Sequence, residues 1–432
     1  MTIWTMKSES QYKMKLKHPW AYRDELLRAP ILPYPGAAVE LQNEKGEVLA
    51  RGYGNLQSKL AFRALSYGNE SGQPTSEEFV IYKLLKAWQR KKDLGFTNSF
   101  RLCFGEGDGL PGLVIDVYKL HPDLKAQALA IQILTAGMDS ILRKNPEIFR
   151  NLIRRAFEKE LCEFDNERTA IIFRNDVRVR EHEGLRKEEA RFVQTVREIE
   201  WSNVPVLVNS YNKTEPLVLN CDLYQGQKTG LFLDQNFNIS TFLRFLSEQK
   251  NAKKIKVLDV CCYVGHWSAQ ISKWAFDHNI EVEIDLIDIS EAALKFAKIN
   301  AQQNSKNPVT INAIKQDALN DWPLKMQDYD IVICDPPAFV KSAKDIENGL
   351  SAYIRLNSES IKRVKKGGFL VSCSCSGLVT KEAFDQSVLK GFIRASTSGY
   401  LLLRGGNAWD HTARPEFSEG HYLKMNTYQV GL

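Results

Sequence analysis

The sequence predicts an α/β protein with a Rossmann-like domain in its C-terminal half, preceded by a small β-barrel and an α+β segment. Beyond about residue 200, apolar strands alternate with helical segments, which is typical of a mostly parallel sheet covered on both faces. Residues 38–66 instead contain short strands separated by turns, the pattern of a small barrel. Because 432 residues are too many for one ordinary core, we predict three domains, over residues 1–80, 81–200 and 201–432.

The predicted barrel has three short strands and is followed by a helix. A turn at Glu44-Lys45-Gly46 separates the first two strands. Ser76 precedes two acidic residues and a run with helical apolar spacing, so we expect an amphipathic helix over 76–92 that begins at this residue. The three strands are expected over residues 37–43, 48–55 and 60–66.

The middle segment is expected to be a strand–helix–strand unit behind a hairpin. A cluster of Gly, Asp and Pro inside residues 99–118 marks the broad turn of the hairpin. A strand over 129–134, one helix over 139–158 and a strand over 169–174 follow.

Five basic residues crowd the end of this segment: Arg174, Arg178, Arg180, Arg186 and Lys187. A run of charged residues most often forms a solvent-exposed surface, a solvated face. The alternative is a surface that contacts RNA, and Arg174 and Arg178 are our candidates for such contacts. The formal net charge of the whole chain is +6, which permits a nucleic-acid partner without demanding one.

Composition and cysteine usage exclude several protein classes. With 44% hydrophobic and 25% charged residues, the chain falls in the globular range. The sequence has no segment of signal-peptide type and no apolar run of about 18 residues, so we expect a cytoplasmic protein without membrane contact. The eight cysteines include no Cys-x-x-Cys pair, which argues against a metal site and for a reducing compartment.

Acidic residues stand at the carboxyl ends of three successive predicted strands. The first strand, over 255–262, contains Asp259 and leads through a tight loop at Gly265 into a helix, a geometry that suits a nucleotide-type cofactor. Asp288 ends the second strand, where a carboxylate can accept hydrogen bonds from both ribose hydroxyls of an adenosine. Asp317 follows the third strand and could meet the adenine amino group. Each acid alone could be a helix N-cap, but three in series favour a cofactor site.

The fourth strand ends in Asp335-Pro336-Pro337-Ala338-Phe339. Two prolines make this loop rigid and free of amide donors, so the Asp335 carboxylate and the backbone carbonyls can face a planar base or a group in transfer. Together with the three acids, the loop indicates a methyltransferase. The first loop lacks the full Gly-x-Gly-x-x-Gly set, which disfavours an NAD-dependent dehydrogenase.

Two cysteines lie on the fifth predicted strand. Cys373 and Cys375 are two residues apart, so their side chains point the same way from an extended strand. A buried cysteine is most often a small hydrophobic residue. Cys375, however, lies at the carboxyl end of the strand, next to the crevice of the Asp335 loop. Cys334, on the preceding strand, is expected to belong to the core.

Longer sequence motifs, here called strings, occur in all three predicted domains. They are Lys17-His18-Pro19-Trp20, LARGYGN (49–55), GEGDGLPG (105–112), RNDVRVR (174–180), GQKTG (226–230) and LDQ (233–235). With the acids and the Pro-Pro loop, these strings resemble the PUA-containing 23S rRNA 5-methylcytosine methyltransferases, a family of class I S-adenosylmethionine-dependent RNA methyltransferases. The resemblance runs over nearly the whole chain.

This resemblance implies a PUA-like RNA-binding domain in front, an α+β middle domain that contacts RNA, and a Rossmann-like class I methyltransferase domain. Ribosomal RNA is the implied partner, and the paired apolar strands of the barrel could support a homodimer. Two positions depart from the family pattern: His266 stands where a second Gly is usual, and Ala338 where Lys is common.

The resemblance also implies roles for individual residues. Cys375 would be the nucleophile, and Asp335 is our candidate for orienting the cytosine amino edge. The implied S-adenosylmethionine pocket consists of Asp259, Tyr263, Gly265, Asp288, Asp317 and Asp335. Expected substrate contacts, beside Arg174 and Arg178, are Lys228, Pro336, Pro337 and Phe339.

The chemistry explains why a thiol is needed. Carbon 5 of cytosine is a poor nucleophile, so a thiolate first adds to carbon 6 and makes the ring an enamine-like species that can attack a sulfonium methyl group. One alternative is methylation of an exocyclic amine or a ring nitrogen, which needs no thiol. A second alternative, motivated by His266, is an RNA-binding protein without catalytic activity.

Overall fold

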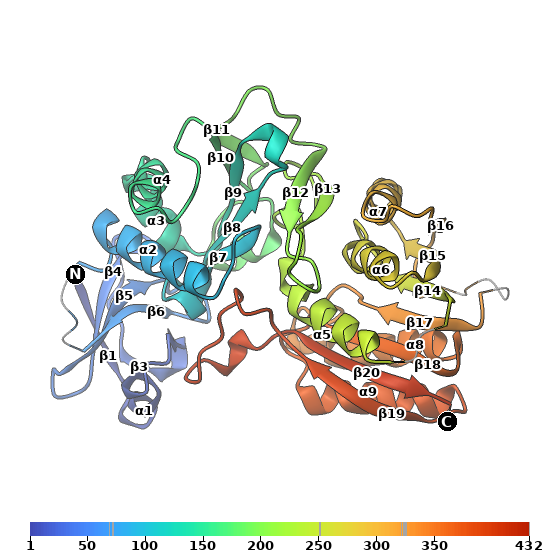
Figure 1. The fold of residues 1–432 in the computed structure, drawn as a ribbon. Helices are drawn as coiled ribbons and strands as arrows, with labels where there is room; N and C mark the ends of the chain where they lie inside the picture. Colours follow the sequence, from blue (N-terminus) through green and yellow to red (C-terminus); the bar gives the residue numbers. More distant parts are fainter. Residues whose placement is uncertain (69, 71–72, 250–251, 321, 323–325, 432) are drawn as a thin grey trace. The chain divides into compact units, whose positions relative to one another are not determined.

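The computed structural model describes residues 1–432 except 69, 71–72, 250–251, 321, 323–325 and 432. The chain forms two compact units, each built from several segments (Figure 1). Unit 1 consists of Met1–Val204, Asp222–Leu231 and Asp410–Gly420, and unit 2 of Pro205–Cys221, Phe232–Trp409 and His421–Leu432. The three-domain division with boundaries at residues 80 and 200 remains our proposal.

The N-terminal part of unit 1 is a six-stranded sheet with the order β2-β6-β5-β4-β1-β3. Its core is apolar, and Trp4 and Phe62 are fully buried there. The three expected strands and the following helix are present, and the side chain of Ser76 caps α2 by accepting the Phe79 N–H at 3.2 Å. The elements are β1 (Thr2–Met6), α1 (Gln11–Lys15), β2 (Trp20–Ala21), β3 (Leu26–Arg28), β4 (Ala38–Gln42), β5 (Val48–Gly54), β6 (Phe62–Tyr67) and α2 (Glu77–Asp93).

The second part of unit 1 is a five-stranded sheet with the order β11-β10-β9-β8-β7, and α2, α3 and α4 pack on one of its faces. The single helix predicted over 139–158 is wrong, because the chain forms two helices there. Pro146 has no N–H and disfavours helical backbone at Asn145, which has φ −128°. The elements are β7 (Phe100–Phe104), β8 (Leu113–Lys119), β9 (Gln127–Ile133), α3 (Ala136–Lys144), α4 (Ile148–Glu158), β10 (Thr169–Phe173) and β11 (Arg191–Gln194).

Arg180, in the predicted basic run, belongs to the interior of unit 1. Its guanidinium donates to the backbone carbonyls of Ile133 and Arg186 and is fully buried. It also lies 3.5 Å from a carboxylate oxygen of Asp139 and 3.4 Å from one of Glu188. Neither the solvated-face nor the RNA-contact interpretation therefore holds for Arg180.

The prediction that Arg174 contacts RNA is also wrong. The residue is fully buried, and its guanidinium donates to the carbonyls of Leu223, at 3.0 Å, and Gly226. These donors hold the segment Asp222–Leu231 to the five-stranded sheet and cannot reach a phosphate. The exposed members of the basic run are Arg178, Arg186 and Lys187.

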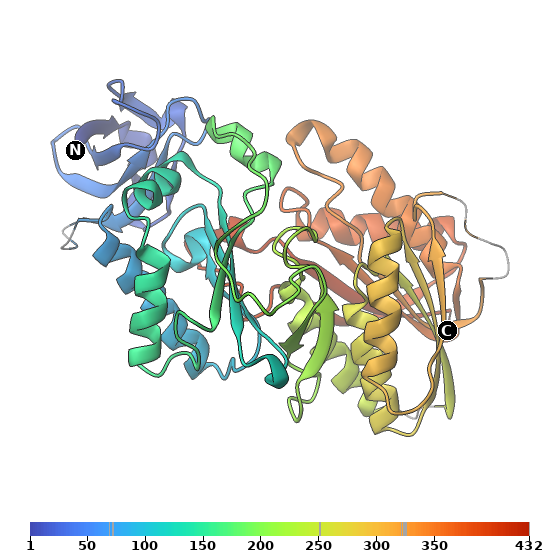
Figure 2. The ribbon, with the colours of Figure 1, turned by 90° about the horizontal axis from the view of Figure 1, so that it is seen from above.

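Unit 2 contains a seven-stranded sheet with the order β16-β15-β14-β17-β18-β20-β19. The strands from β16 to β18 are parallel, and β20 is antiparallel to both of its neighbours, which confirms the mostly parallel sheet. Adjacent residues of β14 show that both faces are covered: Val257 packs in the cluster of α5, α6 and α7, and Leu258 in that of α8 and α9 (Figure 2).

The elements of this sheet and its helices are α5 (Asn236–Ser247), β14 (Lys254–Val260), α6 (His266–Asp277), β15 (Glu281–Asp288), α7 (Glu291–Gln303), β16 (Thr310–Lys315), β17 (Tyr329–Cys334), α8 (Ile346–Ile361), β18 (Val364–Ser374), α9 (Lys381–Arg394), β19 (Gly399–Gly405) and β20 (Lys424–Val430). A separate two-stranded sheet pairs β12 (Val204–Val208) with β13 (Leu217–Cys221). Cys334 is buried in the core, as expected from its strand.

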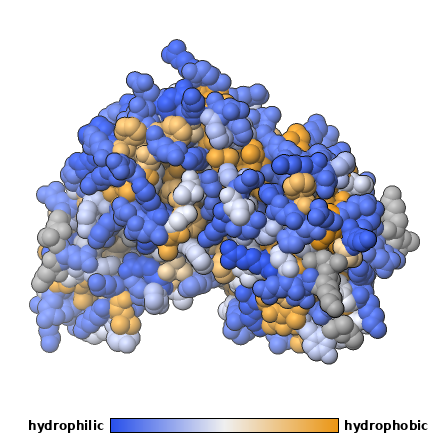
Figure 3. Space-filling view, in the orientation of Figure 1, coloured by the Kyte–Doolittle hydropathy of each residue, from blue (hydrophilic) through white to orange (hydrophobic). Residues whose placement is uncertain are grey.

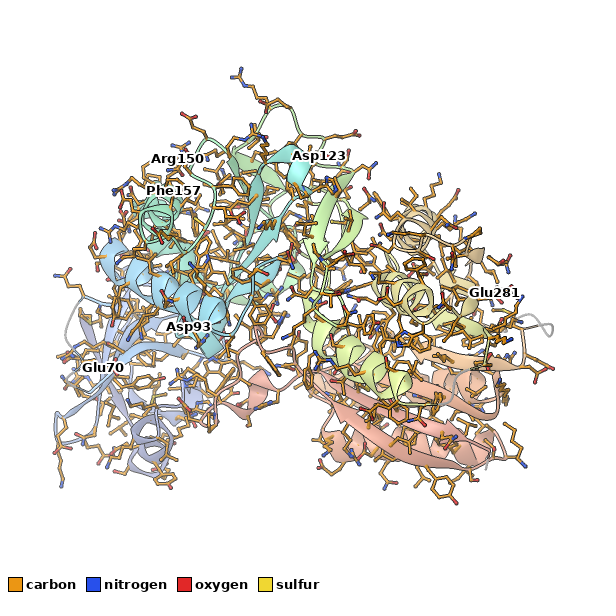
Figure 4. All side chains as sticks on the ribbon, in the orientation of Figure 1. Glu70, Asp93, Asp123, Arg150, Phe157 and Glu281 are labelled. Atoms are coloured by element: carbon orange, nitrogen blue, oxygen red, sulfur yellow. The ribbon has the colours of Figure 1, made fainter. Side chains whose placement is uncertain are left out.

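Hydrophilic residues dominate the face of the molecule in Figure 3, with hydrophobic residues scattered among them. Side chains such as Arg150 and Phe157 on α4 lie at the surface of unit 1 (Figure 4), and Phe157 is 46% exposed. Within the described part of the chain, no helix has the length and apolar character needed to cross a membrane.

We expect Arg180→Ala to lower the stability of unit 1 by about 3 kcal/mol, because it removes a buried guanidinium, leaves the Ile133 carbonyl without that donor and leaves Asp139 with Arg143 as its basic partner. Arg178→Ala, at an exposed position two residues away, is the matched control and should change stability by less than about 0.5 kcal/mol. Urea unfolding followed by intrinsic fluorescence measures both. Equal effects of the two substitutions would contradict the structural role of Arg180.

Candidate active site at the carboxyl ends of the parallel strands

The loop that joins β14 to α6 has an unusual backbone. Cys261, Tyr263 and Gly265 have φ values of 61°, 49° and 74°, in the left-handed region that residues other than glycine rarely adopt. A Cβ atom on Gly265 would lie 2.8 Å from the Cα of Ala297 in α7, so glycine permits the close approach of this loop to α7. Strained backbone of this kind is concentrated at ligand-binding sites.

Asp288 is the last residue of β15, at the opposite end of the strand from Glu281, which Figure 4 labels. Its two carboxylate oxygens accept the backbone N–H groups of Tyr263, at 2.9 Å, and Ser290, at 2.8 Å. Ser290 caps α7, so the N-cap interpretation of Asp288 is wrong. Each carboxylate oxygen has a further lone pair, which leaves Asp288 able to accept hydrogen bonds from a ribose.

Asp317 lies beyond β16, at the neighbouring strand end. It is exposed, and its Oδ1 accepts the backbone N–H of Leu319 at 2.9 Å. The preceding residue, Gln316, donates its backbone N–H to the Asp288 carbonyl at 2.9 Å. Asp288 and Asp317, predicted from the ends of two successive strands, therefore lie close together in space.

Asp259 differs from the other acids. It is fully buried within β14, and its Oδ2 accepts the hydroxyl of Ser268 in α6. Burial raises the pKa of Asp259 to about 7, and the nearby Asp288 carboxylate adds to this rise. With no exposed surface, the Asp259 side chain cannot touch a cofactor, and this corrects the sequence-based assignment. It instead holds the start of α6 against the sheet.

Asp335 immediately follows β17. Its two oxygens accept the side-chain amide of Gln235, at 2.9 and 2.8 Å, and one of them accepts the indole N–H of Trp267 at 3.3 Å. Burial raises the pKa of the Asp335 carboxyl to about 7, and the carboxylates of Asp234 and Asp259 add to this rise. Asp335 is thus oriented by two donors, and burial, reinforced by two nearby carboxylates, disfavours its charge.

Gln235 and Trp267 were missed as site residues by the sequence analysis. Gln235 stands in the LDQ string ahead of the cofactor strand, which was the available signal for it. Trp267 follows Gly265 by two residues, and no pattern in the sequence indicated that its indole would reach the Asp335 loop.

Cys375 directly follows β18 and faces the Pro-Pro loop. Its Sγ lies 3.8 Å from the carbonyl oxygen of Pro336, and the residue is partly exposed. Cys373 is fully buried in the core, and burial raises the pKa of its thiol well above the usual range. Of the two cysteines on this strand, Cys375 is therefore the one that a substrate can reach.

The Pro-Pro loop packs against α8. Phe339 is half-buried and makes an edge-to-face contact with Tyr353, with ring centroids 4.9 Å apart. Pro336 is buried and Pro337 is exposed, so Pro337 presents the accessible surface of the loop.

The remaining predicted substrate contacts lie in the other unit. Lys228 is exposed and belongs to the Asp222–Leu231 segment of unit 1, and Arg178 is exposed in the same unit. Tyr263, Gly265, Asp288, Asp317 and Asp335, together with the Pro-Pro loop and Cys375, all belong to unit 2. The roles of these residues toward cofactor and substrate remain proposals.

The residues at this sheet edge fit S-adenosylmethionine. That molecule carries a cationic sulfonium and a cationic amino group, and its ribose offers two hydroxyl donors. Burial and the nearby carboxylates of Asp234 and Asp259 raise the pKa of Asp335, and a bound cation would offset the cost of its charge. Asp288 offers carboxylate lone pairs for the ribose hydroxyls.

Two segments of the chain match known protein families. Residues 5–67 match the PUA-like domain family, and residues 226–404 match the methyltransferase small domain family. The N-terminal PUA-like domain and the C-terminal methyltransferase fold expected from the sequence are thereby confirmed.

Curated relatives and solved structures cover nearly the whole chain. A protein named ribosomal RNA large subunit methyltransferase I from Aeromonas hydrophila is 28% identical over 98% of both chains, and one of the same name from Aeromonas salmonicida is 29% identical over 94% of both. A putative S-adenosylmethionine-dependent methyltransferase from Streptococcus mutans has the same fold, with a TM-score of 0.73 at 18% identity over all of both chains.

We expect Asp288→Ala to weaken S-adenosylmethionine binding by about tenfold to 150-fold, because a charge-assisted hydrogen bond contributes about 1.5–3 kcal/mol. The control is Glu291→Ala, which removes an exposed acid three residues away and should leave the affinity unchanged. Isothermal titration calorimetry measures both. Unchanged binding in a folded Asp288→Ala protein would mean that the pocket lies elsewhere.

Cofactor affinity should also depend on pH. A cation bound near Asp335 favours its ionised form, so binding releases a proton wherever this carboxyl, with a pKa of about 7, is protonated beforehand. Affinity should therefore fall as the pH drops below about 7 and level off above it, with a weaker dependence in Asp335→Asn. Equal affinities across this range in the wild-type protein would refute a carboxyl of raised pKa beside the cofactor.

Proposed function

Because the chain is a class I S-adenosylmethionine-dependent methyltransferase with a PUA-like domain, we propose that it methylates carbon 5 of a cytosine in large-subunit ribosomal RNA. The RNA class is supported by the relatives named ribosomal RNA large subunit methyltransferase I, which align over 98% and 94% of this chain. The position on the base is supported by one observation above all: a partly exposed thiol, Cys375, lies 3.8 Å from the Pro336 carbonyl.

In this proposal Cys375 starts the reaction on the base. Its thiolate adds to carbon 6 of the cytosine, forming an S–C6 bond and moving a ring electron pair onto carbon 5. S-Adenosylmethionine supplies an electrophilic methyl group to that carbon. Loss of the carbon 5 proton then restores the ring double bond, and the sulfur leaves as thiolate.

Asp335 orients the base for this attack. A carboxylate can accept the exocyclic N–H of cytosine, and Gln235 and Trp267 fix the direction in which the Asp335 oxygens point. Asp288 and the loop around Tyr263 would hold the adenosine part of the cofactor. Pro337 and Phe339 supply the remaining surface of the loop that faces the base.

The departure at His266 is compatible with catalysis. His266 is the first residue of α6 and is buried, and burial lowers its pKa to about 4. The side chain is therefore neutral at physiological pH and brings no charge toward a sulfonium. An RNA-binding protein without catalytic activity would be revealed by the failure of labelled S-adenosylmethionine to bind.

Cys375→Ala should abolish methyl transfer and leave cofactor binding intact, because only the bond to carbon 6 is lost. Cys373→Ala is the matched control on the same strand and should cost only packing. RNA that carries 5-fluorocytidine should remain covalently attached to the wild-type enzyme, since fluorine cannot leave as the proton does. A normal rate in Cys375→Ala, together with no adduct on a denaturing gel, would favour methylation of an amine or ring nitrogen.

RNA binding by unit 1 should depend on the exposed part of the basic run. The triple substitution of Arg178, Arg186 and Lys187 by Ala should weaken rRNA binding and reduce the salt dependence of log K by about 0.7 to 0.9 for each phosphate that is no longer neutralised. Substituting Lys86, Lys92 and Arg154, which are exposed helix positions, removes the same charge and serves as the control. Equal weakening by both triple variants in filter-binding titrations would mean that net charge alone matters.

A further inference from the structure

Lys424 is a buried cation next to the segment that carries Cys375. It is the first residue of β20, and it pairs in register with Ser374, which immediately precedes the cysteine. The residue is 9% exposed. Its Nζ donates to the carbonyl oxygens of Ser376 and Val379, at 2.8 Å each. The ammonium group is therefore fixed against the backbone that follows the thiol.

This lysine is electrostatically unusual. Among the residues that the structure describes, no carboxylate lies within ion-pair distance of Lys424. Burial lowers its pKa to about 8, and the Cys375 thiolate opposes that change. A buried cation bonded only to neutral carbonyls is costly, and a nearby anion offsets the cost. Ionisation of Cys375 would supply that anion.

We propose that Lys424 is a positioning residue that stabilises the thiolate of Cys375 for its attack on the RNA base. When the thiol ionises, the Sγ–H bond breaks, the proton leaves to solvent, and Lys424 keeps its three ammonium protons. The same cation stabilises the thiolate when it leaves carbon 6 at the end of the reaction. This inference rests on the proposed function, which assigns Cys375 as the nucleophile.

The other titratable groups around Cys375 cannot take this role. Tyr353 on α8 bonds to the hydroxyls of the two serines that flank Cys375, and burial raises its pKa to about 12. Burial likewise keeps Cys373 on β18 protonated. Asp335, beyond β17, is negative when it is ionised and would then disfavour a thiolate at Cys375. Lys424 on β20 supplies the positive charge.

The test measures the acidity of Cys375 directly in the full-length protein. Iodoacetamide alkylation is followed as a function of pH by mass spectrometry of the Cys375 peptide. The midpoint of the rise in alkylation rate with pH reports the ionisation of the Cys375 thiol. We expect Lys424→Gln to raise this midpoint by about one pH unit, since a nearby opposite charge shifts a pKa by about one to three units. Lys424→Arg should restore part of the shift, and Lys366→Gln, an exposed lysine on β18, should leave the midpoint unchanged.

A second measurement leaves Lys424 in place. Cys375→Ser should lower the pH at which Lys424 becomes reactive toward acetic anhydride, because the coupling between two charges is reciprocal. An unchanged Cys375 midpoint in a folded Lys424→Gln protein overturns the proposal. So does an unchanged Lys424 reactivity in Cys375→Ser.

Methyl transfer is measured separately, so that the two proposals fail in different ways. If Cys375→Ala still methylates RNA, the proposed function fails, and the role of Lys424 in that reaction falls with it. If Cys375→Ala is inactive and the alkylation midpoint does not move in Lys424→Gln, only the role of Lys424 fails.

Discussion

The parallel pairing of β14 with β15 on one side and β17 on the other is the constraint on which the candidate site depends. It brings the carboxyl ends of successive strands to one edge, although Asp288 and Asp335 are far apart in the chain. The loop after β14 can then donate the Tyr263 N–H to Asp288, and the backbone N–H of Asp335 can donate to the carbonyl of Val260. Helices on both faces keep this edge as the accessible end of an otherwise buried sheet.

Burial at this edge has opposite effects on acids and bases. It raises the pKa of Asp335 and Asp259 to about 7, and it lowers that of Lys424 to about 8. In each case burial disfavours the charged form, and a partner of opposite charge offsets this effect. A cationic cofactor beside Asp335, and a thiolate beside Lys424, would each relieve the cost of burying an uncompensated charge.

Local patterns in the sequence predicted most of the secondary structure. Ser76 and the acids after it predicted the start of α2, and the strand ahead of Gly265 and the strand that ends at Asp288 follow from their apolar runs. The break between α3 and α4 could also have been predicted, because Pro146 stands inside the expected helix. These features depend on neighbours within a few residues, which a single sequence shows directly.

Long-range contacts could not be predicted in the same way. Gln235 bonds to Asp335 across 100 residues, and Lys424 reaches the carbonyl of Ser376 across 48. Arg174 and Arg180 look like surface charges in the sequence, but backbone carbonyls from other elements take their donors inside unit 1. Whether a charged side chain faces solvent or satisfies a buried acceptor is decided by tertiary packing, which leaves no periodic signal in the sequence.

The central claim is that the methyl group goes to carbon 5 of cytosine. The most direct measurement is the identity of the methylated nucleoside. Large-subunit rRNA from cells that lack this gene would be incubated with the purified protein and isotope-labelled S-adenosylmethionine, digested to nucleosides and analysed by liquid chromatography with mass spectrometry. We expect the label in 5-methylcytidine. Label in a nucleoside methylated on an exocyclic amine or a ring nitrogen, with none in 5-methylcytidine, would contradict the account.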